Sequence, residues 1–261
     1  MTDLPLTFGA LVGVVLSAGF VYVEVGRFAT PQVPETLFDE RREVFGYTAG
    51  LFVGIPLAIA FLFFLDSMGN GALPGALLFL ALLVAGIEIA QWALLRTRYW
   101  GDGESGPFYA LGYRAGIGGI FGLTVVAQYF SGPVVSVTGV AVVVVQSAAI
   151  VGLEVTGGLL SLPPSETAGR RGGGPLPGAV FAAVGFFLIG LGPLADTATV
   201  SGQEVAVAGA LVALLGSLLV YRRLRPMLET IPAPSAGPPV ATPRPAGAYG
   251  RTDRSKGGAR P

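Results

Sequence analysis

The sequence has no cysteine and no histidine among its 261 residues. The chain therefore cannot form a disulfide bond, ligate haem or copper through imidazole, or build a Ser-His-Asp or Cys-His catalytic pair. Its single lysine, Lys256, lies in a polar C-terminal stretch, so no apolar segment offers a lysine for a retinal Schiff base. A Walker phosphate-binding pattern is also missing. We therefore expect no cofactor, no metal ion and no enzymatic activity.

Charge is scarce as well. Only 12% of the residues are charged, against about 25% in an average soluble domain, and 52% are hydrophobic. The apolar residues are gathered in long runs, and a run of about 18 residues can cross ~30 Å of hydrocarbon as a helix. Seven such runs occur, at about 4–25, 46–65, 73–95, 108–130, 134–155, 176–195 and 204–221. The sequence predicts an all-α integral membrane protein with a seven-transmembrane-helix bundle over residues 1–225, located in the cell membrane.

Basic residues flank these runs on alternate connections. The first run has no basic segment before it, so we interpret it as a permanent helix rather than a secretion signal. The ends of the runs on one side carry Arg27, Arg41, Arg42, Arg96, Arg98, Arg170, Arg171, Arg222, Arg223 and Arg225. The other side carries only acids: Asp3, Asp66, Asp196 and Glu204. Since positively charged connections stay in the cytoplasm, we predict the N-terminus outside and the C-terminus in the cytoplasm.

Three segments outside the runs also carry a signal. Residues 34–45 have one apolar face, which favours a short helix lying at the lipid headgroups, with a docking or gating helix as the alternative. Residues 226–261 are basic and rich in Pro and Gly, which predicts a disordered tail. Residues 101–106 fit a dinucleotide-binding glycine pattern, but no strand precedes them, so we reject it. The preference for arginine, 15 residues against one lysine, favours a GC-rich prokaryotic genome.

An internal duplication is suggested by two segments 130 residues apart. Residues 17–25 and 147–155 are identical at five of nine positions, and each contains a serine and a glutamate seven residues later. This offset predicts a parallel 3+1+3 layout in which the fourth helix is the linker. The layout resembles that of the sugar-efflux class of seven-helix transporters and one proposed for opsins, without any shared motif. Chance similarity between helices rich in Ala and Val is the alternative.

Charges inside the apolar runs are the candidate functional residues. Each costs about 2.5–3.5 kcal/mol to insert at the centre of a membrane helix, so such groups face the bundle interior or water. We expect Arg114 to pair with Glu88, and Gln91 shares the helical face of Glu88. The candidate polar cluster is Glu24, Glu88, Gln91, Arg114 and Glu154.

We expect this cluster to line a cavity open to the cytoplasm, with the aromatic residues Trp92, Tyr109 and Tyr113 nearby. The alternative is a structural salt bridge, with Glu24 and Glu154 reaching out to the membrane interface.

The second run carries Gly46, Gly50 and Gly54 at four-residue spacing, followed by Pro56. Small residues at this spacing let helices approach closely, and Pro56 should kink the helix. Close packing is the favoured interpretation, with a hinge for alternating access as the alternative.

These features favour a gradient-driven transporter or a channel-like protein for a small polar solute or ion. The alternatives are a non-catalytic structural or regulatory subunit of a membrane complex, and a seven-helix sensor that lacks retinal. The expected partners are the lipid bilayer, a small polar solute or ion, and a second copy or another membrane subunit; no nucleic acid is expected.

Overall fold

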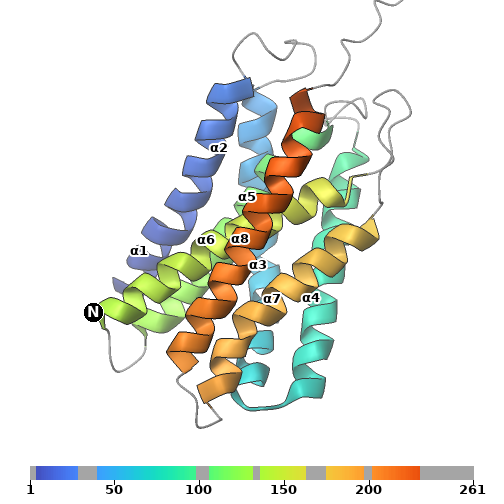
Figure 1. The fold of residues 1–261 in the computed structure, drawn as a ribbon. Coiled ribbons are helices and arrows are strands. Elements are labelled where there is room, and N and C mark those ends of the chain that lie inside the picture. Colours follow the sequence, from blue (N-terminus) through green and yellow to red (C-terminus); the bar gives the residue numbers. More distant parts are fainter. Residues whose placement is uncertain are drawn as a thin grey trace, which may run out of the picture. The chain divides into compact units, whose positions relative to one another are not determined.

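A computed structural model describes residues 4–28, 40–97, 106–131, 136–162, 175–196 and 202–229. All secondary structure in these ranges is helical. The first span is α1 (Leu4–Gly9), a π-helical turn η1 (Ala10–Val14) and α2 (Val15–Phe28). The six that follow are α3 (Glu40–Gly69), α4 (Leu73–Leu95), α5 (Gly106–Phe130), α6 (Val137–Leu160), α7 (Pro175–Asp196) and α8 (Gly202–Glu229) (Figure 1). Seven helices are long and apolar enough to cross a membrane, as a multi-pass membrane protein requires.

Many large apolar side chains face outward and several polar side chains are buried, as in a protein surrounded by lipid. Large apolar residues point away from the bundle, including Phe52, Ile59, Ile89 and Leu219. Several polar side chains are fully buried instead, including Ser17, Arg114, Ser147 and Glu154. Water would favour the reverse arrangement, because it solvates polar groups and expels apolar surface. The distribution therefore supports a hydrocarbon environment around the helices.

Helix α5 forms the centre of the bundle and packs most extensively against α3 and α6. Glycine makes the contact with α3 close. A Cβ on Gly50 would collide with the carbonyl oxygen of Tyr113, and a Cβ on Gly116 with that of Tyr47. Gly54 lies against the side chain of Ile120, whose Cβ would be 2.9 Å from a Cβ added at this glycine. The two backbones thus touch along a stripe of small residues, which maximises dispersion contacts where lipid provides no hydrophobic driving force.

Close packing is the interpretation that the sequence favours for Gly46, Gly50 and Gly54, and all three glycines are buried. Pro56 lies inside α3, which continues as one helix on both sides of it. The hinge role of these residues stays a prediction.

The bundle has two chemically different ends. One, the arginine-rich end, carries Arg41 and Arg42 at the start of α3, Arg96 after α4, and Arg222, Arg223 and Arg225 near the end of α8. The opposite end carries Asp66 near the end of α3 and Glu204 at the start of α8. A tight turn with Gly71 at φ 68° joins α3 to α4 at this opposite end. Which end faces the cytoplasm stays a prediction.

Two predicted segments differ from the observed helices. Residues 40–45 are not part of a separate interfacial helix, because α3 begins at Glu40 and continues to Gly69. The physical reason is that the buried face of α3 includes Glu43, which lies about one turn before Gly46 and about two turns before Gly50. Helix α8 continues to Glu229, so residues 226–229 are helical rather than part of the predicted tail. Residues 34–39, 98–105 and 230–261 lie outside the described ranges.

The proposed duplication receives mixed support from the packing. Ser17 and Ser147, which the 130-residue offset aligns, both face glycines of α5, namely Gly119 and Gly122. The remaining contacts differ, however. Helix α6 packs along α8, whereas within the described residues the first span has no comparable contact with α4. The repeat therefore stays a prediction.

Candidate functional site

Arg114 lies in the first half of α5 and is completely buried. Its guanidinium donates from each of its three nitrogens to a different side chain. Nη2 donates to Glu88 Oε1 at 2.5 Å, Nη1 donates to Glu154 Oε2 at 3.0 Å, and Nε donates to Gln91 Oε1. The Gln91 amide then donates to the Gly158 carbonyl oxygen at 3.1 Å. One arginine thus links α5 to both α4 and α6, and Gln91 links α4 to α6.

The local sequence explains why these groups meet. Glu88 and Gln91 are three residues apart in α4, so they project from one face. Gly158 is four residues after Glu154 in α6, and a Cβ at Gly158 would lie 2.5 Å from Arg114 Cγ. Gly118 of α5 lies close to the backbone of α6, because a Cβ added at Gly118 would be 3.0 Å from the Cα of Val151. Gly158 thus leaves the space that the arginine side chain fills, and Gly118 lets α5 and α6 approach closely beside Glu154.

The cluster carries one positive and two negative groups, which leaves one excess negative charge. Both Arg114 and Glu154 are 0% exposed, so neither borders a space large enough for water. Glu154 Oε1 makes no hydrogen bond to the described residues. An uncompensated charge in a low-dielectric interior is costly, so a proton or a cation would stabilise this cluster.

Four of the five sequence-predicted cluster residues are therefore in direct contact: Glu88, Gln91, Arg114 and Glu154. Glu154 does not reach out to the interface. Helix α6 extends to Leu160, five residues beyond the predicted end, which places the carboxylate deeper than expected. Glu24 is also buried, on α2, and is not among the partners of the Arg114 guanidinium.

Arg114 itself borders no cavity, because direct side-chain contacts surround the guanidinium and leave it unexposed. Glu88 and Trp92 line a mostly apolar cavity of about 710 Å³ between α4 and α7, and its access to the cytoplasm stays a prediction. Tyr109 and Tyr113, which the sequence analysis places near the cluster, are both buried. Trp92 instead points outward, and the guanidinium carbon of Arg96 lies 3.7 Å from the centre of its ring. This cation–π contact orients the arginine at the end of α4.

One buried acid is absent from the cluster that the sequence predicts. Glu43 of α3 is buried, and a Cβ at Gly112 would lie 2.6 Å from its Oε1. The residues directly before it, Glu40, Arg41 and Arg42, favour a solvated segment and so obscure its burial. The available signal is its helical position, which continues the stripe of glycines toward the arginine-rich end.

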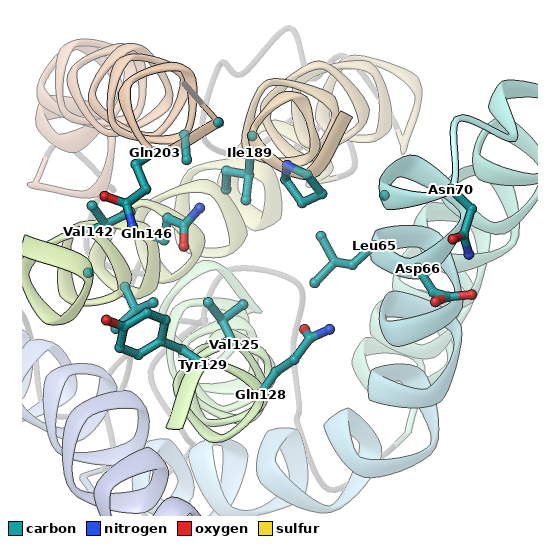
Figure 2. A pocket seen from close by; sticks show the side chains of 17 residues that line it. Leu65, Asp66, Asn70, Val125, Gln128, Tyr129, Val142, Gln146, Ile189 and Gln203 are labelled. Carbon is teal, nitrogen blue, oxygen red and sulfur yellow. The ribbon is translucent and has the colours of Figure 1, made fainter. Parts of the chain in front are cut away.

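A cavity of about 510 Å³ lies at the opposite end, among α3, α5, α6, α7 and α8 (Figure 2). Its polar lining residues are Asp66, Asn70, Gln128, Tyr129, Gln146 and Gln203. Tyr129 fixes one wall, because its hydroxyl accepts from the Ser136 amide at 2.8 Å and donates to the Ser136 carbonyl at 3.1 Å. These contacts hold the end of α5 against the start of α6.

Three packed aromatic rings, called the aromatic barrier below, lie between the cavity and the Arg114 cluster along α5. Phe61, Phe121 and Phe186 are completely buried, with ring centroids 5.0, 5.6 and 5.9 Å apart. Arg114, Phe121 and Gln128 follow one another at seven-residue intervals along α5, so they share a face about 10 Å apart. One face of α5 thus carries the charge cluster, the barrier and the cavity in order.

Comparison with known protein families, curated proteins and solved structures finds no match. The function of the chain therefore has to be argued from the chemistry of these sites.

The two sites differ in what they can do. The Arg114 cluster is dry at Arg114 and Glu154 and holds three helices together, and its excess negative charge suits a proton or cation. The cavity is open and lined with amides, which both donate and accept hydrogen bonds. It can accommodate a small solute without desolvating a buried charge.

Proposed function

We propose that the chain moves a small polar solute or ion across a membrane, as a gradient-driven transporter or channel-like protein. The cavity at the opposite end is the vestibule, the three phenylalanines are the closed barrier, and the Arg114 cluster is the polar group beyond it. The alignment of these three parts on one face of α5 is the observation that supports this proposal. Intramembrane charges commonly mark solute or ion pathways, which is a second support.

The structural alternative has one observation in its favour. Arg114 and Glu154 contact each other directly, with both side chains fully buried. Such a contact suits a subunit whose charges hold helices together without any turnover. This alternative predicts that vesicles containing the chain alone stay impermeable and that a membrane partner co-purifies with it.

Osmotic swelling of reconstituted vesicles discriminates the two functions even though the solute is unidentified. The purified chain is placed in lipid vesicles, and light scattering follows their swelling in a panel of small neutral, cationic and anionic solutes. We expect wild-type vesicles to swell faster than empty vesicles in at least one solute. The Phe121→Ala variant should swell faster still, because the missing ring leaves a gap in the barrier.

The matched control is Phe52→Ala, which removes an equal ring from the exposed surface of α3. This variant should behave like wild type. Glu88→Gln, which removes one charge of the cluster, should change the rate for the permeant solute. If wild-type and Phe121→Ala vesicles are both as impermeable as empty ones, the transport proposal is refuted and the structural alternative is favoured.

A further inference from the structure

The chemistry of the cavity distinguishes between cationic and anionic solutes. Among the seventeen described residues that line it, Asp66 is the one charged side chain and none is basic. Its other polar groups are amides and one phenol, and Figure 2 shows the labelled Gln128 and Gln146 side chains around the cavity. An anion would find no positive partner in this lining.

Gln146 provides an independent indication of a ligand. This side chain is 8% exposed and lines the cavity, and no hydrogen bond joins it to another described residue. Its amide atoms reach the accessible space of the cavity, because they are not among the fully buried side-chain atoms that lack a partner. A solute or water in the cavity would satisfy it.

The helix ends around the cavity contribute partial charges of both signs. The C-terminal portions of α3, α5 and α7 contribute lining residues, and each presents the partial negative charge of its last carbonyl groups. The N-terminal portions of α6 and α8 oppose them. At α6, however, the Ser136 hydroxyl already accepts a hydrogen bond from the Gly139 amide at 3.0 Å. The last carbonyl oxygens of α3 and α5 are satisfied as well: those of Asp66, Ser67 and Met68 accept from backbone amides in the α3–α4 turn, and that of Ala127 accepts from the Ser131 amide. The helix ends therefore leave Asp66 as the charge that decides the sign of the cavity.

From the charge of the lining and the amide of Gln146 that no described residue pairs, we propose that the cavity binds a small organic cation, with its charged group near Asp66 and a polar group hydrogen-bonded to Gln146. The volume of about 510 Å³ equals the liquid volume of roughly 17 water molecules, at about 30 Å³ each. This is room for a metabolite-sized ammonium compound. A bare divalent metal ion would need several carboxylate or carbonyl ligands at close range, and the lining has one carboxylate.

This inference deepens the proposed function by naming the solute class, and its test needs no transport. Because the chain has no cysteine, a single introduced cysteine is its only thiol. Val142→Cys places that thiol in the cavity wall while keeping Gln146 and Asp66. Detergent-solubilised protein is then reacted with three methanethiosulfonates of similar size: cationic trimethylammonioethyl, neutral hydroxyethyl and anionic sulfonatoethyl. Each rate is divided by the rate with free 2-mercaptoethanol.

We expect the normalised rate of the cationic reagent to exceed that of the anionic one about fivefold to tenfold. Adding Asp66→Asn should lower this ratio about threefold, the scale of a partly solvated charge interaction. The matched control is Glu204→Gln, which removes a carboxylate from the same end of the bundle but outside the cavity lining. It should leave the ratio unchanged. If Val142→Cys does not fold, Gln203→Cys serves as the reporter.

Protection by a ligand completes the test. Choline should slow the reaction of the neutral reagent with Val142→Cys, whereas its uncharged isostere 3,3-dimethylbutan-1-ol should not. Gln146→Leu should weaken this protection about tenfold. An equal or faster anionic rate would overturn the proposal, and equal protection by the isostere would show a site for neutral solutes instead. A cation-selective cavity in impermeable vesicles would refute transport and leave the cation site standing.

Discussion

Removal of the positive charge from the Arg114 cluster is the perturbation with the largest expected effect on stability. Arg114→Met keeps a long side chain but leaves Glu88 and Glu154 buried without their partner. Breaking a buried ion pair by removing one member costs about 3–5 kcal/mol. For a folded unit of 150–250 residues, 1 kcal/mol shifts Tm by about 2–4 °C, so Tm should fall by about 6–20 °C.

Restoring the charge balance of the cluster tests the reasoning more sharply than the loss of stability in Arg114→Met does. If the cost comes from the uncompensated carboxylates, neutralising both should recover most of it, because a neutral cluster can replace a buried ion pair at little cost. The triple variant Arg114→Met/Glu88→Gln/Glu154→Gln should therefore be much more stable than Arg114→Met alone. The variant Glu88→Gln/Glu154→Gln should be less stable than wild type, because it leaves the arginine buried without an anion.

Thermal unfolding in detergent, followed as the fraction that stays monodisperse after heating, measures these differences at a fixed heating rate. Glu40→Gln removes an exposed acid at the start of α3 and serves as the control, with an expected Tm change within about 2 °C. An Arg114→Met variant as stable as wild type would refute the reasoning. A triple variant no more stable than Arg114→Met would show that side-chain fit, rather than charge, sets the cost.

Three further predictions follow from the packing and the topology. Gly50→Ala should destabilise the protein by about 1–3 kcal/mol in the same unfolding assay, because its Cβ has no room against α5. Gly216→Ala should be neutral or stabilising by up to about 1 kcal/mol, because the added Cβ would have no atom of another helix within 4 Å. Tyr129→Phe should cost about 1–3 kcal/mol, because the hydroxyl hydrogen bonds that join α5 to α6 are lost. In intact cells, an impermeant thiol reagent should label Asn70→Cys at the opposite end and not Thr97→Cys at the arginine-rich end; the reverse labelling would invert the predicted orientation.

The helices are largely predictable from the sequence because their signal is length and hydropathy. Seven apolar runs correspond to seven apolar helices. The ends are less predictable, since a charged residue can belong either to a connection or to a buried face. Glu43 shows the difficulty: its neighbours suggest a solvated segment, and only its register with the α3 glycines places it inside.

The two candidate sites differ in how far the sequence can reveal them, and the cause is the free energy of burying each kind of group. A charge in hydrocarbon is so costly that its partner must be another charge, which is why the pairing of Arg114 with Glu88 can be foreseen. A neutral amide costs far less, so Gln128, Gln146 and Gln203 could each face lipid headgroups, a neighbouring helix or a cavity. Three helices, α5, α6 and α8, must be placed before these amides converge. Only then does it become visible that the Gln146 amide faces a cavity instead of a protein partner.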